Sequence, residues 1–191
     1  MKGGLRATDD FEYAAESRSR PYVVGPMAVV TLPLGFSFEF DALYRRSGYS
    51  AASGNALYSA LIREVDNVWE FPLLARHRIP IPAFRPYAEA GWAPRVGHGS
   101  KIISGYGLSA INPYTYTPYF RRDHTDWRIT HGVVVGGGIQ IPAGRLQFSP
   151  ELRYTHWNRQ VVFGNFPDGP GYGSSQDQLD VLLGISWRVG K

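Results

Sequence analysis

Charged side chains recur at every second position within otherwise apolar stretches of this chain. Between positions 36 and 45, Glu39, Asp41 and Arg45 share one face and phenylalanines occupy the other. Acids and bases enclosed on facing strands must pair, because an isolated buried charge is costly. The expected inward charges are Glu39, Asp41, Arg45, Glu70, Arg76, Arg78, Glu89, Arg95, Glu151, Arg153, Asp180 and Arg188. Such a set fits a gated ion path or a structural salt-bridge network; we favour the network, since side chains fill the interior of a barrel of about eight strands.

Two histidines are the candidates for hydrolytic chemistry. His131 and His156 are expected to face each other on the outer side of two paired strands, near one rim, with His124 nearby. A hydrolase needs a histidine beside a serine and an acid, and a metal site needs three or four converging ligands. No serine accompanies either histidine, and Thr155 is expected to point inward. We therefore predict that these histidines are polar surface residues at the rim of the barrel, and we predict no catalytic residue and no metal site.

Glycine-rich and cysteine-based sites are not expected. Residues 105–110 match the pattern G-x-G-x-x-A, but a dinucleotide site requires a preceding strand and a following helix. Asn112 and Pro113 follow within a loop-like segment, which disfavours a helix. The chain has no cysteine, which removes disulfides, thiolate metal sites and cysteine nucleophiles. No cofactor is predicted.

Aromatic residues make up 14% of the chain. Rings that carry a polar atom suit membrane–water interfaces and binding loops. The tryptophans fall near the ends of predicted strands and are expected to form an interfacial girdle of Trp69, Trp92, Trp127, Trp157 and Trp187. A long predicted loop carries a second group, Tyr106, Tyr114, Tyr116 and Tyr119. These tyrosines either bind an extracellular protein or glycan, or fold over the barrel mouth and pack on one another.

The elements that must position these residues are β-strands. Apolar and polar residues alternate over about 10 to 15 residues, against about 5 or 6 for a soluble strand. Strands are expected at 2–6, 22–32, 36–48, 67–79, 85–96, 127–141, 145–158 and 178–190. Short links (33–35, 80–84 and 142–144) alternate with long ones (7–21, 49–66, 97–126 and 159–177). This pattern predicts one all-β domain over residues 1–191, an antiparallel up-and-down eight-stranded transmembrane β-barrel with a truncated first strand.

The turn at Ala143 and Gly144 sets an expected register for one hairpin. If Pro142 pairs with Arg145, then Ile141 lies opposite Leu146 and the pattern continues along both strands. Every outward residue then meets an outward residue, which a one-residue slip would break. The two histidines at 131 and 156 become neighbours in this register.

The start of the chain predicts an incomplete first strand. Lys2 to Arg6 is too short to cross a bilayer, and Met1 leads into polar residues without an export signal. We expect a mature or trimmed form whose signal peptide has been removed. Because part of the last strand, near 187–191, is then unpaired, we expect this form either to be less stable than one extended upstream or to recruit another strand and self-associate.

Charge and hydropathy exclude two broad classes. The net charge is +4 and the basic residues are scattered among acids, so no nucleic-acid partner is predicted. No stretch reaches about 18 consecutive apolar residues, so no transmembrane helix is expected. A mean hydropathy of -0.24 still suits a barrel, whose apolar positions occupy every second residue.

Several segments resemble the outer-membrane β-barrel domain family, the small eight-stranded barrels similar to OmpA and OmpX. They are Lys2–Leu5, Ala42–Arg46, Trp69–Leu74, Arg85–Gly91 and Pro150–Tyr154. The resemblance covers nearly the whole chain and implies a barrel in the bacterial outer membrane, in contact with its lipid. Its motifs mark strands and carry no catalytic residues.

Three functions remain open at this level. The first is a non-enzymatic outer-membrane barrel that serves as envelope structure or as a porin-like or surface-binding scaffold through its long loops. The second is an outer-membrane lipid-modifying enzyme that uses the rim histidines. The third is a soluble lipocalin-like calyx, in which the apolar face points inward and the charged face outward.

Overall fold

The computed structural model describes residues 1–13, 15–54, 58–81, 85–108, 115–160, 163–164 and 172–187. Nearly all of this part is β-structure. The strands are β1 (Lys2–Arg6), β2 (Phe11–Tyr13), β3 (Ala15–Ser17), β4 (Tyr22–Gly25), β5 (Met27–Thr31), β6 (Phe36–Asp41), β7 (Leu43–Gly54), β8 (Tyr58–Glu70), β9 (Leu73–Arg78), β10 (Pro86–Leu108), β11 (Tyr116–Ile139), β12 (Ile141–Ala143), β13 (Leu146–Trp157), β14 (Phe163–Gly164), β15 (Tyr172–Ser174) and β16 (Asp177–Trp187). A 3-10 turn, η1 (Pro33–Gly35), joins β5 to β6. The described part contains no helix with the length and apolarity that a membrane crossing requires.

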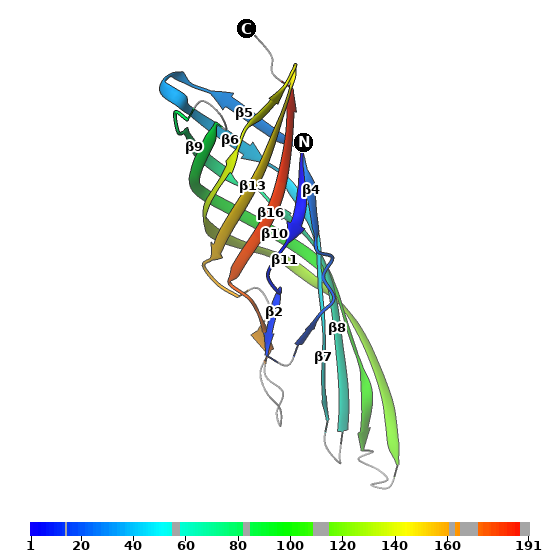
Figure 1. Cartoon of the computed structure of the whole chain (residues 1–191). Coiled ribbons are helices and arrows are strands. Elements are labelled where there is room, and N and C mark those ends of the chain that lie inside the picture. Colours follow the sequence, from blue (N-terminus) through cyan, green and yellow to red (C-terminus); the bar gives the residue numbers. More distant parts are fainter. Residues whose placement is uncertain are drawn as a thin grey trace.

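The strands close into an antiparallel barrel with eight strand positions, as the sequence predicts (Figure 1). Going around the wall, β11, β13, β16, β1, β4, β7, β8 and β10 are neighbours, and β10 pairs with β11 to complete the circle. Toward the end that carries η1, β5, β6 and β9 take the places of β4, β7 and β8. Three predicted strands are therefore each built from two segments.

Prolines lie at two of these three breaks, and Ala42 lies at the third, between β6 and β7. Pro26 separates β4 from β5, and Pro72 lies between β8 and β9. A proline has no backbone N–H and cannot donate to the ladder. Its carbonyl still accepts: the N–H of Ala42 bonds to Pro26 O at 3.1 Å, and the N–H of Asp41 bonds to Pro72 O at 3.1 Å. The breaks therefore lie side by side and interrupt the wall at one level.

Side chains on the wall alternate between a buried polar face and an exposed apolar face. In β6, Phe36, Phe38 and Phe40 are 47–48% exposed, whereas Glu39 is 0% and Asp41 is 5% exposed. The same alternation runs along β13 and β16. The interior is therefore polar, and the buried apolar residues form only small clusters between the charges. This arrangement confirms the prediction that the charged face points inward and the apolar face outward. It contradicts the lipocalin-like calyx, which requires the apolar face to point inward.

Two of the predicted long loops are wrong. Residues expected in the links 49–66 and 97–126 continue the strands, so that β10 has 23 residues and β11 has 24. Together with β7 and β8 they form a four-stranded extension that projects beyond the barrel (Figure 1), which we call the ribbon. Turn-like Gly, Ser and Tyr residues suggested loops, but pairing with a neighbouring strand overrides such weak local preferences.

The hairpin register differs from the expectation by two residues. Ala143 pairs with Leu146 and Ile141 with Phe148, because Gly144 and Arg145 form the turn. Gly144 has a φ of +61°, the left-handed region that favours glycine at the first position of a two-residue hairpin turn. A shift of two residues keeps every side chain on its face but changes its neighbours.

The first strand pairs on both sides. Lys2–Arg6 lies between β16 and β4, and the backbone of Met1 exchanges hydrogen bonds of 2.7 Å with Ile185. Self-association through the last strand stays a prediction. On the same side of the barrel as the ribbon, β2, β14 and β15 form a small separate sheet, and β3 pairs with β7.

Candidate functional site

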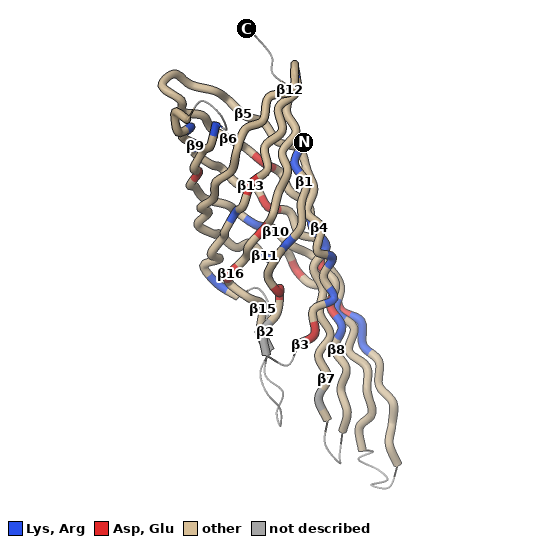
Figure 2. Tube along the Cα trace, viewed as in Figure 1, with Lys and Arg blue, Asp and Glu red and all other residues tan. Residues whose placement is uncertain are grey.

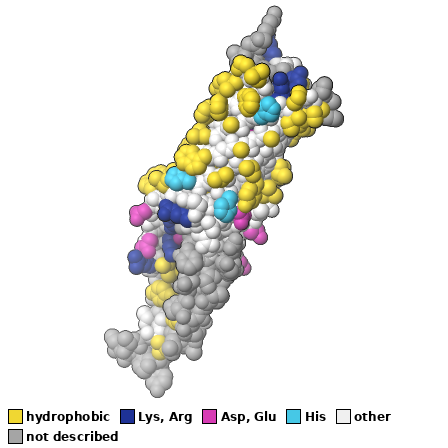
Figure 3. Space-filling model, turned by 90° about the vertical axis from the view of Figure 1, so that its left-hand side faces the viewer, with side chains coloured by type: hydrophobic (Ala, Val, Ile, Leu, Met, Phe, Trp, Pro, Cys, Tyr) yellow, Lys and Arg dark blue, Asp and Glu magenta, His cyan; other side chains and the backbone are white. Residues whose placement is uncertain are grey.

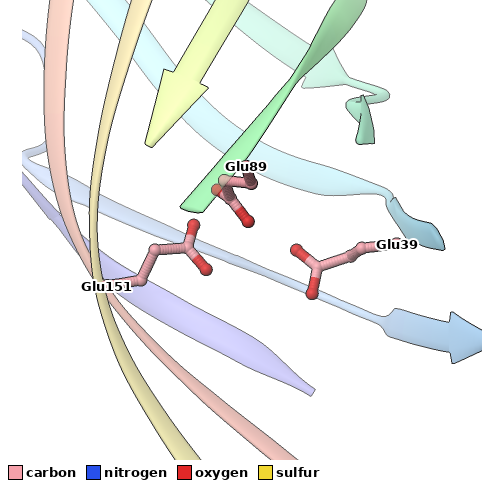
Figure 4. Close-up of side chains that lie close together, drawn as sticks. All are labelled: Glu39, Glu89 and Glu151. Carbon is pink, nitrogen blue, oxygen red and sulfur yellow. The ribbon is translucent and has the colours of Figure 1, made fainter. Parts of the chain in front are cut away.

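Three buried carboxylates converge at the centre of the barrel. Glu39 comes from β6, Glu89 from β10 and Glu151 from β13, and their carboxylates point toward one another (Figure 4). Their oxygen atoms lie within 4.8 Å of one another. Alternation places each on the inward face of its own strand, and the closure of the barrel brings the three together.

Three cations are interleaved with these carboxylates. Lys2 bonds to Glu39 and lies 2.9 Å from Glu151. Arg76 contacts Glu39, Glu89 and Glu151, each at 2.6 Å. Arg153 lies 2.7–3.3 Å from the carboxylates of Glu39, Asp41, Glu89 and Glu151. We call this set the central network: Lys2, Glu39, Asp41, Arg76, Tyr87, Glu89, Glu151 and Arg153.

The geometry of the central network favours a structural role. Carboxylate oxygens suit hard metal ions, but each of these carboxylates already contacts an ammonium or a guanidinium. The side chains of Arg76 and Arg153 are only 2% exposed and lie across the interior between strands on opposite sides. A filled, ion-paired interior is what a barrel of about eight strands accommodates.

A second cluster lies next to the central network, toward the ribbon. Arg45 contacts Glu70 at 3.0 Å and Asp180 at 3.2 Å, and the amide of Gln178 donates to Asp180 at 2.6 Å. The indole of Trp157 donates to Gln178 at 2.9 Å. Figure 2 shows these charges through the middle of the barrel, whereas the far end of the ribbon carries none.

A third pair of acids lies at the base of the ribbon. Asp66 sits 3.6 Å from Arg128, and Glu64 sits 2.6 Å from the same guanidinium. The hydroxyl of Thr125 donates to Asp66 at 3.1 Å. Burial, together with the neighbouring charge of Glu64, raises the pKa of Asp66 to about 6, against the opposing effect of Arg128.

The structure places the predicted inward charges as follows. Glu39, Asp41, Arg45, Glu70, Arg76, Glu89, Glu151, Arg153 and Asp180 are all buried inside the barrel. Arg95 is also inward, with its guanidinium 3.9 Å from the ring of Trp157, and Arg78 is exposed at the η1 end. Arg188 lies outside the described residues.

Sequence reasoning missed several members of these clusters. Lys2, Tyr87 and Gln178 share the inward face with the predicted charges, and counting by two from Glu89 and Asp180 would have found Tyr87 and Gln178. Lys2 was overlooked because five residues show too little alternation to define a face.

One tryptophan contradicts the predicted girdle. Trp157 is 1% exposed and packs inside the barrel against Val134 and Ala93. It occupies an inward position of β13, so its ring replaces a charge in the lumen rather than facing outward. The other four, Trp69, Trp92, Trp127 and Trp187, are 38–66% exposed on the outer surface.

The histidines are not neighbours. His156 pairs with Val133, and the ring of His131 stacks on Trp92 with centroids 5.2 Å apart. The imidazole of His156 lies 2.7 Å from Asp177, which also accepts a hydrogen bond from the hydroxyl of Tyr154 at 2.5 Å. Within the described residues, neither ring has a hydroxyl hydrogen-bond partner, and a hydrolytic triad needs one.

The tyrosine group lies on the ribbon rather than in a loop. Tyr106, Tyr116 and Tyr119 are 40–56% exposed on β10 and β11, and the Tyr119 hydroxyl donates to Ser59 O at 3.1 Å. Tyr114 lies outside the described residues. The exposed rings belong to paired strands, which hold them more firmly than a loop would.

No family model, no curated protein and no solved structure matches this chain. The geometry therefore carries the functional argument.

Proposed function

We propose that this protein is a non-enzymatic barrel of the bacterial outer membrane, built on up-and-down topology. One observation carries the proposal, the reversed polarity of the wall. Large apolar side chains cover the outside of the barrel (Figure 3), and ion pairs fill the inside. In water, so continuous an apolar surface is unfavourable, whereas lipid chains would cover it and leave the buried charges paired.

Strand length supports the same proposal. β13 has 12 residues. At about 3.3 Å per residue this is about 40 Å of strand, and a tilt of about 40° leaves about 30 Å along the barrel axis, close to the hydrocarbon thickness of a bilayer.

The ends of the apolar wall carry side chains suited to a membrane interface. Trp69, Trp92 and Trp127 are exposed where the ribbon begins, and Trp187 is exposed at the η1 end. Just beyond Trp69, the exposed Arg46 would meet anionic lipid headgroups. On this reading the ribbon with Asp66 lies outside the membrane.

The ribbon is the part of the molecule suited to a surface-binding role. It projects away from the barrel on paired strands and presents Tyr106, Tyr116 and Phe120, the last 70% exposed. Exposed aromatic rings on a rigid support favour recognition of protein or glycan. An extracellular partner of this kind is part of the proposal.

The test is whether the folded chain requires an amphiphile. We expect the protein to remain in the outer-membrane fraction after urea or alkaline washing. In non-ionic detergent it should migrate faster on a gel before boiling than after boiling, because an intact barrel resists unfolding by dodecyl sulfate. A monodisperse, folded protein in buffer without detergent or lipid would contradict the proposal.

A further inference from the structure

The barrel has a cup at its η1 end that differs in chemistry from the rest of the interior. The cup has a volume of about 320 Å³ and is lined by Val29, Thr31, Leu32, Leu34, Gly35, Phe36, Ser37, Arg78, Arg85, Gln140 and Gln147. Deeper in the lumen, Glu39 follows Ser37 on the inward face of β6, and Arg76 precedes Arg78 on that of β9. The central network therefore lies below the cup, deeper in the barrel.

Two arginines in the cup have no counter-charge. Arg78 and Arg85 form no ion pair and no side-chain hydrogen bond with any other described residue. By contrast, Arg76, two residues before Arg78 on β9 and deeper in the barrel, contacts three carboxylates. The nearest acids, Glu39 and Glu89, are held by Lys2, Arg76 and Arg153 and are unavailable to the cup. Two uncompensated guanidiniums facing one cavity attract an anion.

The remaining lining supplies further donors. Gln140 lies between β11 and β12, and Gln147 lies on β13; their side-chain amides make no hydrogen bond with described residues. Two planar guanidiniums and two amides offer more donors than a carboxylate with two oxygens can use, and they suit the three or four oxygens of a phosphate group. Val29, which is partly buried on β5, also lines the cup and offers an apolar side chain against which the carbon part of a phosphate ester can pack.

We propose that this cup binds a phosphate group. The group belongs either to a soluble phosphate ester or to the headgroup of a phospholipid. The site is defined by Arg78, Arg85, Gln140 and Gln147 and is independent of the membrane location proposed above.

The experiment measures binding to the detergent-solubilised folded protein with two probes. Inorganic phosphate is titrated in a maltoside detergent, and phosphatidylglycerol is titrated in the same micelles, each followed by the amide signals of Gln140 and Gln147 in a nuclear magnetic resonance spectrum. Saturable shifts with inorganic phosphate indicate a soluble ligand. Saturable shifts with phosphatidylglycerol alone indicate a lipid headgroup.

A matched pair of variants separates the cup from general electrostatics. Arg78→Gln with Arg85→Gln should weaken binding of the effective probe by at least about tenfold, since each loses a charge-assisted hydrogen bond to the anion. Arg121→Gln with Arg145→Gln removes the same charge from exposed positions outside the cup and should change affinity by less than about twofold.

Three results would overturn the proposal. The first is the absence of saturable shifts with both probes in the unaltered protein, which needs no variant to fold. The second is an equal loss of affinity in the two double variants. The third is a set of shifts that leaves the amides of Gln140 and Gln147 unaffected.

Discussion

Removal of Arg153 is the sharpest test of the central network. Arg153 is buried and contacts four carboxylates, at 2.7 Å for Glu151, 2.9 Å for Asp41, 3.0 Å for Glu39 and 3.3 Å for Glu89. In Arg153→Gln, Lys2 and Arg76 remain to face these acids. Removing one partner of a buried ion pair costs about 3–5 kcal/mol, and the loss of a guanidinium shared by several carboxylates places this variant at the upper end.

The control is an ion pair of the same type at the surface. Arg121 lies 2.9 Å from Asp123, with side chains 73% and 36% exposed, so Arg121→Gln should cost at most about 1 kcal/mol. The assay is denaturant unfolding of the detergent-bound protein, followed by tryptophan fluorescence and by gel mobility without boiling. Adding Glu151→Gln to Arg153→Gln should restore part of the loss, because it removes one of the four buried carboxylates that Lys2 and Arg76 alone would have to balance. Equal costs for Arg153→Gln and Arg121→Gln would refute the reasoning and indicate a hydrated lumen.

Three further outcomes are expected. Trp157→Ala should destabilise the barrel by about 3–5 kcal/mol in the same unfolding assay, because it empties a packed site, whereas exposed Trp187→Ala should cost less than about 1 kcal/mol. Gly144→Ala should cost about 1 kcal/mol from strain at its positive φ alone, since no atom lies within 4 Å of the added carbon; a neutral result would mean that the turn has another conformation. The raised pKa of Asp66 favours its protonated form in the folded state, so its contribution to stability is full below about pH 4 and is lost as the pH rises through about 6. Amide hydrogen exchange at the base of the ribbon, corrected for intrinsic rates, should therefore quicken across that interval, and Asp66→Asn should abolish the step.

Alternation predicted the barrel and most of its interior because it is a property of single strands. Glu39, Asp41, Glu151 and Arg153 stand at every second position, and the backbone of an extended strand sends such residues to one side. No neighbour is needed to define that side. Trp157 follows the same rule, since alternation along β13 places it on the inward face. The prediction of an outward ring was wrong because it relied on the preference of tryptophan for membrane interfaces and not on the position of the residue in the strand.

Contacts between strands required the tertiary structure. The register of the hairpin at Gly144 depends on which residues occupy the turn. The expected register and the observed one differ by two residues, so both leave every side chain on the same face, and the sequence pattern does not distinguish them. The ribbon extends to Leu108 and Tyr116 because β8 pairs with β10 and β10 with β11, although their local composition is loop-like.

The amino-acid sequence by itself determined which side chains point into the barrel, since that depends only on a period of two along each strand. Only the tertiary structure decided which of them meet. Glu39, Glu89 and Glu151 lie on separate strands, and Arg78 ends β9 whereas Arg85 precedes β10, so their distances depend on the stagger of strands around the closed wall. That stagger pairs every acid of the central network with a base and leaves the two arginines of the cup without an acidic partner among the described residues.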